Sequence, residues 1–119
     1  MASAGKTRAT HRIWPFVVSC HVVVADERRL PGYLTDISAA GARVLCDEDP
    51  PWVGSGVVLE VRLGRRLVRT RLPARVIWLG DGPAGARVFG LAFAEIGSEE
   101  RAILEAVVAD FQRRASELA

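Results

Sequence analysis

A short polar turn, Asp36-x-Ser38-x-x-Gly41, carries the clearest chemical pattern in this chain of 119 residues. Asp and Ser side chains can accept hydrogen bonds from backbone amides one or two residues further on, and these bonds close a tight turn. Glycine at the exit either permits a positive φ or lets another group approach the backbone closely. On its own, the pattern is typical of an ordinary turn between two strands.

Arg8 and Arg12 form an Arg-x-x-x-Arg pair upstream of this turn, just before the first apolar stretch. A guanidinium group is planar and makes paired contacts with phosphate or guanine better than lysine does. The segment from Met1 to Thr10 lacks periodicity and is rich in small residues. We therefore expect both arginines to lie on a flexible N-terminal arm, residues 1–12.

Six short apolar stretches around these motifs indicate β-strands, because they are rich in β-branched residues and alternate with period two. In the fourth stretch the alternation places Glu60 outward, and Gly64-Arg65 then forms a plausible hairpin turn. In the fifth, it places Trp78 inward, and Pro73 predicts a bulge or an edge position. The stretches cover residues 16–24, 30–37, 42–46, 57–63, 67–79 and 88–93.

A C-terminal helix follows the last stretch. Ser98 is a suitable N-cap, and Glu99 and Glu100 are favoured in the first turn by the helix dipole. Apolar residues recur at helical spacing from Ile103 to Phe111. The sequence thus predicts an all-β domain with a terminal helix, arranged as a small antiparallel barrel.

The two motifs in this order, with strands between them, resemble the PilZ domain, a bacterial receptor module for cyclic di-GMP. The resemblance runs from Arg8 to Phe111: Arg75-Val76-Ile77-Trp78 is similar to the family's late strand, and Gly90-Leu91-Ala92-Phe93 to its last strand. It implies a closed six-stranded antiparallel split barrel with a C-terminal α-helix. We expect this barrel and helix to span residues 13–117, after the arm.

The resemblance also implies a function and a set of ligand-binding residues. The ligand would be cyclic di-GMP, bound by Arg8, Arg12, Asp36, Ser38 and Gly41, with no cofactor and no metal. Binding would order the arm against the Asp36–Gly41 turn, so that a protein partner acting in trans, in motility, biofilm or a related process, reads the new surface. The partner, the ligand stoichiometry and the oligomeric state stay open at this stage.

Composition fits one domain with a single core, since half of the residues are hydrophobic and the formal net charge is only +2. Neither cysteine lies in a Cys-x-x-Cys pair, so buried free thiols in a reducing compartment are expected. No apolar segment has the roughly 20 residues that span a bilayer, and the first residues lack a secretory signal pattern. We expect a cytoplasmic protein.

Three other functions fit the sequence less well. An enzyme would need His11 or His21 as a base, and neither has a nucleophile elbow or metal-ligand spacing nearby, so we expect no catalysis. A nucleic-acid-binding barrel is suggested by a basic hairpin, but exposed aromatic residues are few; its arginines are residues 62, 65, 66, 69, 71 and 75. A PilZ-type adaptor independent of nucleotide generally lacks both motifs, which are intact here.

Overall fold

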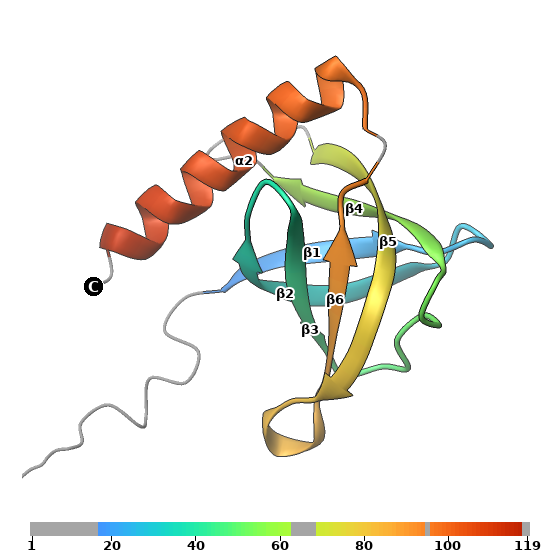
Figure 1. The fold of residues 1–119 in the computed structure, drawn as a ribbon. Helices are drawn as coiled ribbons and strands as arrows, with labels where there is room; N and C mark the ends of the chain where they lie inside the picture. Colours follow the sequence, from blue (N-terminus) through green and yellow to red (C-terminus); the bar gives the residue numbers. More distant parts are fainter. Residues whose placement is uncertain (1–16, 63–68, 95, 118–119) are drawn as a thin grey trace, which may run out of the picture.

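The computed structural model describes residues 17–62, 69–94 and 96–117. Six antiparallel strands close into one barrel, and a single long helix lies across one end of it (Figure 1). The strands are β1 (Val18–Val23), β2 (Arg29–Ile37), β3 (Gly41–Cys46), β4 (Gly56–Arg62), β5 (Arg69–Asp81) and β6 (Arg87–Ala92). The 3-10 turn η2 (Pro83–Gly85) joins β5 to β6, and α2 (Ser98–Glu117) ends the fold.

The order of strands around the barrel is β1-β2-β3-β6-β5-β4, and β1 pairs with β4 to close it. The predicted six-stranded antiparallel barrel with a C-terminal helix is therefore confirmed. Each described end of a strand lies within two residues of the end expected from the sequence. The predicted Gly64-Arg65 turn lies outside the described residues.

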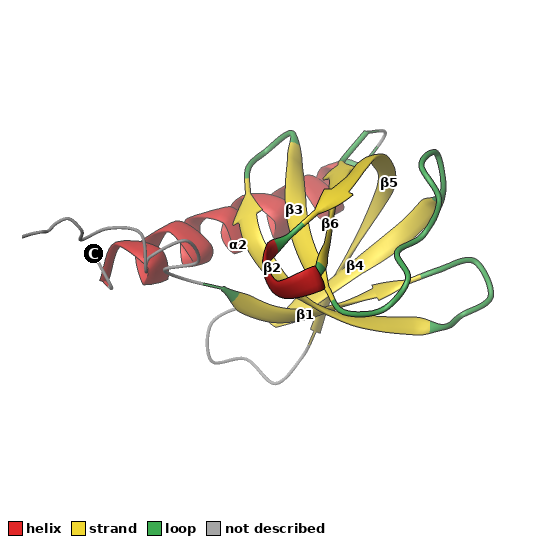
Figure 2. Cartoon of the chain, turned by 90° about the horizontal axis from the view of Figure 1, so that it is seen from below, coloured by secondary structure: helices red, strands yellow, loops and turns green. Residues whose placement is uncertain are grey.

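The core fills the barrel mainly with aliphatic side chains, together with phenylalanines and the two cysteines, as the period-two alternation predicts. Phe89, Leu30, Leu59 and Leu72 are fully buried. The helix closes the end of this core with Leu104, Val107 and Phe111, which recur at helical spacing and are all buried. Figure 2 shows α2 running along the end of the strands.

Gly97, rather than the predicted Ser98, is the N-cap of α2. Its carbonyl accepts the first helical hydrogen bond from Arg101 N–H at 2.9 Å, and its own N–H donates to Glu100 Oε1 at 2.9 Å. Glu100 thus occupies the third helical position and reaches back, as in a capping box. The glutamate supplies the side-chain half of the cap, so a serine is not needed.

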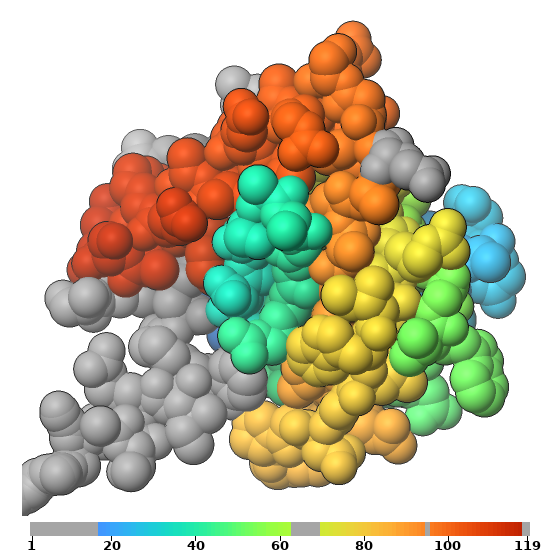
Figure 3. All heavy atoms as spheres, viewed as in Figure 1, coloured from blue at the N-terminus to red at the C-terminus, as the bar shows by residue number. Residues whose placement is uncertain are grey.

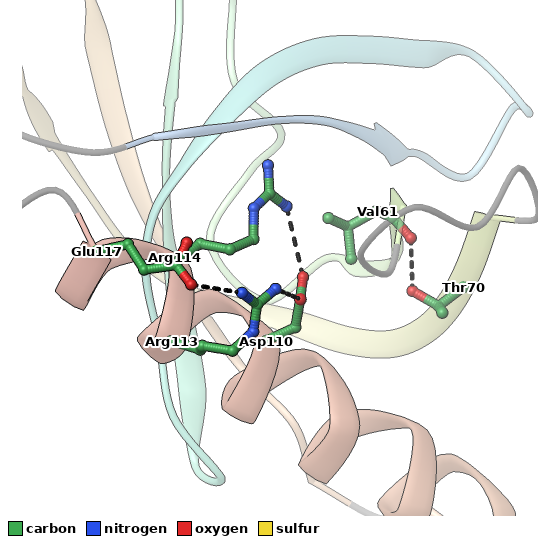
Figure 4. Close-up of polar contacts among 6 residues, drawn as sticks. All are labelled: Val61, Thr70, Asp110, Arg113, Arg114 and Glu117. Carbon is green, nitrogen blue, oxygen red and sulfur yellow. Dashed lines mark hydrogen bonds and ion pairs between the residues drawn. The ribbon is translucent and has the colours of Figure 1, made fainter.

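The C-terminal half of α2 is held by an ion-pair cluster on Asp110, whose side chain is only 14% exposed. Arg113 Nη2 lies 2.9 Å from Asp110 Oδ1, and Arg114 Nη1 lies 3.4 Å from Asp110 Oδ2 (Figure 4). Arg113 also donates to Glu117 at 2.8 Å. Near the helix, Thr70 Oγ1 donates to the Val61 carbonyl at 2.7 Å and ties the ends of β5 and β4 together.

Glu60 faces outward from β4, as predicted, yet its side chain is nearly fully buried. Arg29 Nη2 on β2 lies 2.9 Å from Glu60 Oε1, and Arg71 on β5 pairs with the other carboxylate oxygen. A buried carboxylate is tolerated only when such charged partners satisfy it. The two arginines therefore cover an acid that alternation alone would leave in water.

Pro73 lies where β5 has a paired neighbour on one side only. It pairs with Val58 on β4 without a register shift, whereas pairing with β6 begins at Arg75. The edge position predicted for this proline is confirmed, because a residue without an N–H is tolerated there. The bulge lies further on, between Val76 and Trp78 in the pairing with β6.

Both cysteines, Cys20 and Cys46, are free and buried, as predicted. Burial raises the pKa of Cys20 to about 12, and it also raises the pKa of Cys46. The thiols are protonated at neutral pH and therefore poor nucleophiles. None of the helices in the described part of the chain has the length and hydropathy that a bilayer-spanning helix needs.

The core makes a direct stability prediction. Replacing fully buried Leu59 with alanine removes packed methyl groups and leaves a cavity, so we expect the free energy of unfolding to fall by about 2–5 kcal/mol. The matched control is Leu79→Ala, because Leu79 is 41% exposed and should cost about 1 kcal/mol or less. Urea denaturation measures both; equal losses would contradict the placement of Leu59.

Candidate functional site

The Asp36–Gly41 turn connects β2 to β3 and is closed by its own serine. Ser38 Oγ accepts hydrogen bonds from the N–H groups of Ala40 at 3.2 Å and Gly41 at 3.4 Å. Ser38 N–H donates in turn to the Gly41 carbonyl at 2.8 Å. The hydroxyl therefore organises the turn, as Ser side chains do when they bond to nearby backbone amides.

The turn is also fixed from outside by β6. Phe93 N–H donates to the Ala40 carbonyl at 3.0 Å, and Gly41 pairs with Ala92. A Cβ on Gly41 would lie 2.1 Å from the Leu91 carbonyl oxygen, whereas the φ of Gly41 is not positive. Glycine is therefore needed here for the close approach of the neighbouring backbone, and not for a positive φ.

Four residues on four neighbouring strands form a lateral row on the outer face of the barrel, next to this turn. Asp36 on β2 pairs with Arg43 on β3, Arg43 pairs with Gly90 on β6, and Gly90 pairs with Trp78 on β5. Directly paired residues point to the same face of a sheet. With strands about 4.8 Å apart, the row is roughly 14 Å long.

Figures 1 and 3 show β3, β6 and β5, three of the strands that carry the row, side by side below the helix, and β2 is the other neighbour of β3. Asp36 and Arg43 meet at one end of the row, with Asp36 Oδ2 3.5 Å from Arg43 Nη2. Their side chains are 62% and 47% exposed. An ion pair this exposed is weak, so both groups can turn to another partner at small cost.

Trp78 occupies the other end, and its expected inward orientation was wrong. The register shift between Val76 and Trp78 adds a residue to β5, so alternation breaks after Val76, and Trp78 is 40% exposed. The indole lies against Gly90, because a Cβ there would be 2.1 Å from Trp78 Nε1. Gly90 thus makes room for the aromatic ring.

A shallow hollow adjoins the row between the indole and the β5–β6 connection. It has a volume of about 360 Å³, and its lining includes Arg43, Trp78, Asp81 and Pro83. A cation, a carboxylate and an aromatic surface therefore meet in this hollow. Such a surface can pair with charged groups and stack on a planar ring.

The structure brings together three of the five site residues predicted from sequence, namely Asp36, Ser38 and Gly41. Arg8 and Arg12 lie outside the described residues. Arg43 and Trp78 were missed as site residues. Arg43 could have been found by counting outward-facing positions from Gly41, but no signal in the sequence marks the bulge that exposes Trp78.

The described residues hold no group of three or more His, Cys, Asp or Glu side chains that could bind a metal. The site is thus built from a carboxylate, a guanidinium group, an aromatic ring and backbone groups. Groups of these kinds can bind and orient a ligand.

Comparison with known proteins now identifies the family. The PilZ domain profile matches residues 6–110, which is most of the chain. The chain belongs to the PilZ family. The match includes Arg8 and Arg12 as well as the Asp36–Gly41 turn, so both motifs lie within the family region of this PilZ domain.

Solved PilZ structures have the same fold. The PilZ domain of YcgR from Escherichia coli, solved with c-di-GMP, aligns with a TM-score of 0.69 at 18% identity, over 85% of this chain and 86% of that one. The PilZ domain of CeSA from a cellulose-synthesizing bacterium aligns with a TM-score of 0.59 at 20% identity, over 84% and 95%.

A third similar structure is the Bacillus subtilis inhibitor of motility MotI/DgrA, with a TM-score of 0.61 at 20% identity. The alignment covers 87% of this PilZ domain but only 49% of that chain. At these identities the likeness shows a shared fold. A search of curated proteins gives no match.

The close contact at Gly41 can be tested by mutation. Gly41→Ala would force a methyl group against the Leu91 carbonyl, so we expect the free energy of unfolding to fall by about 1–3 kcal/mol. Gly56→Ala is the control, because no atom lies within 4 Å of a Cβ there. It should leave stability unchanged or raise it by up to about 1 kcal/mol in urea denaturation. Equal effects would contradict the close approach of β6.

Proposed function

We propose that this PilZ domain is a receptor for cyclic di-GMP, bound on the outer face of the barrel. The observation that carries the proposal is the row from Asp36 through Arg43 and Gly90 to Trp78, set beside the Ser38-closed turn. Family membership supports it, and so does the similar YcgR PilZ domain, whose solved structure contains c-di-GMP.

The row offers a complementary group for each part of the ligand. Asp36 can accept hydrogen bonds from guanine N–H groups, and Arg43 can pair with a phosphate or with guanine O6 and N7. The exposed part of the Trp78 indole can stack on a guanine ring, which is worth about 1–3 kcal/mol per base. Gly41 contributes indirectly, because its missing side chain lets β6 lie against the turn.

Arg8 and Arg12 supply the second half of the site in this proposal. The N-terminal arm, residues 1–12, closes over the ligand, while residues 13–117 form the barrel and helix. Ordering a residue costs about 1–2 kcal/mol of backbone entropy, whereas a hydrogen bond to a charged group contributes about 1.5–3 kcal/mol. Four such bonds from the two arginines, together about 6–12 kcal/mol, offset the ordering of the roughly five residues from Arg8 to Arg12, which costs about 5–10 kcal/mol.

The exposed Asp36–Arg43 pair suits a site that changes state on binding. Because the pair is solvent-accessible, separating it releases a carboxylate and a guanidinium group for the ligand with little loss. The ligand thereby exchanges a weak surface contact for several charge-assisted hydrogen bonds. The resulting arrangement of arm and barrel is the signal, which a protein partner reads in trans.

Binding to nucleic acid is less well supported by the described arginines. Arg71 pairs with buried Glu60, and Arg75 Nη1 donates to the Gly54 carbonyl at 2.6 Å. Both guanidinium groups are thus already committed within the fold. A nucleotide-independent adaptor would have no use for the row beside the turn, whereas a receptor uses each member.

Arg12→Ala and Asp36→Ala test the proposal from the two sides of the site. We expect each to lower the affinity for cyclic di-GMP by about 100-fold or more in calorimetric titration, because each removes several charge-assisted hydrogen bonds. Arg101→Ala is the matched control, since Arg101 is an exposed arginine on α2. It should titrate like the wild type.

Two checks make this titration decisive. Circular dichroism must show that the variants remain folded, and chromatography of the recovered ligand should show intact cyclic di-GMP, since a receptor does not consume its ligand. Wild-type affinity in folded Arg12→Ala or Asp36→Ala would contradict the proposed site. Cleavage of the ligand would contradict the receptor function.

Trp78→Ala tests the stacking surface separately. Loss of one base stack predicts an affinity for cyclic di-GMP reduced by about tenfold, and Trp78→Phe should recover part of it because a smaller aromatic ring remains. Trp52→Ala is the control, because Trp52 is exposed elsewhere on the barrel. Unchanged affinity in Trp78→Ala, or an equal loss in Trp52→Ala, would rule out stacking on this indole.

A further inference from the structure

A second exposed apolar surface lies on the connection between β3 and β4, which the nucleotide site does not use. Trp52 is 83% exposed, Val53 is 55% exposed, and Ile77 on the neighbouring β5 is 50% exposed. Large apolar side chains grouped in this way mark protein-interaction sites, whereas single exposed ones are common. We call this surface, with the acidic residues 47–49 beside it, the Trp52 surface.

The backbone that presents Trp52 is fixed to the barrel. Ser55 N–H donates to the Trp52 carbonyl at 3.0 Å, and Gly54, with φ of 95°, completes this turn. Gly54 N–H donates to the Val76 carbonyl at 2.7 Å, and Val76 N–H donates to the Ser55 carbonyl at 3.0 Å. The loop therefore lies alongside β5 next to Ile77, and a partner would meet an ordered backbone at little entropic cost.

Tandem prolines place this apolar surface at a set distance from three acids. Pro51 is buried against the barrel, and prolines restrict the chain to extended conformations. Asp47, Glu48 and Asp49 precede them and are all exposed. No ion pair is found for these three carboxylates within the described part of the chain.

The charges beside the Trp52 surface indicate which kind of partner it can bind. Asp47, Glu48 and Asp49, for which no ion pair is found among the described residues, form a local negative region in a chain of net charge +2. This region favours a cationic partner and repels the phosphates of nucleic acids and anionic membranes. Arg75, which also lies at this loop, is held by the Gly54 carbonyl. A guanidinium group can also stack on an exposed indole such as Trp52.

We propose that the Trp52 surface docks a basic segment of a partner protein. An arginine or an apolar side chain of that segment packs on Trp52, Val53 and Ile77, while neighbouring lysines or arginines pair with the acids before the prolines. The Trp52 surface is separate from the row that runs from Asp36 to Trp78, but both involve β5. Val76 of β5 holds the loop that carries Trp52, and Trp78 of β5 ends the row.

The test uses two short synthetic peptides, one of alternating arginine and leucine and one of alternating glutamate and leucine. Each is titrated into the ¹⁵N-labelled protein, and the indole N–H signals of Trp52 and Trp78 are followed by NMR. We expect the arginine peptide to shift the Trp52 signal, with an affinity that falls as salt is raised, and the glutamate peptide to leave it unchanged.

Variants separate the two parts of the surface. Trp52→Ala should weaken binding of the arginine peptide about tenfold, with binding then followed by calorimetry, and the double change E48Q/D49N should weaken it several-fold. The matched control E99Q/E105Q removes the same amount of charge from exposed or half-exposed positions on α2 and should bind like the wild type.

Three results would overturn the proposal. The first is a failed peptide test: the arginine peptide does not shift the Trp52 signal, or it binds the E48Q/D49N variant as tightly as the wild type. Another is a single-stranded oligonucleotide that binds this surface more tightly than the peptide does. The third is a dimer, seen by analytical ultracentrifugation, that is lost in Trp52→Ala, which would assign the surface to a second copy of the chain.

Discussion

The close approach of β6 to the turn between β2 and β3 is the constraint on which the candidate site depends. Gly41 has no side chain, so the Leu91 carbonyl can lie where a Cβ would otherwise be, and Phe93 can bond to Ala40. This contact places β3 beside β6, although β4 and β5 lie between them in the chain, and brings Asp36 and Arg43 into one row with Gly90. A side chain at Gly41 would disturb the barrel and the site together.

A second backbone irregularity completes the row. The register shift in β5 turns Trp78 outward, and Gly90 leaves room for its indole against β6. Two glycines and one bulge thus produce a preformed surface, with an ion pair at one end and an aromatic ring at the other. A preformed surface lowers the entropic cost of binding, because the strands that carry these groups are already ordered.

Sequence predicted the parts of the fold that depend on local pattern. Alternation and turn residues gave the six strands, helical spacing gave Leu104, Val107 and Phe111, and the polar motif gave the turn closed by Ser38. It failed where distant residues decide the outcome. Trp78 is exposed because of pairing with β6, and Glu60 is buried because Arg29 and Arg71 reach it from other strands. Neither effect has a local signature.

A crystal structure of the protein with cyclic di-GMP tests the central claim most directly. The account predicts a nucleotide on the outer face between Asp36 and Trp78, a guanine on the Trp78 indole, Arg8 and Arg12 in contact with the ligand, and a Ser38-closed turn unchanged from the free state. A nucleotide bound elsewhere, or one bound at this face with Arg8 and Arg12 far from it, would contradict the account.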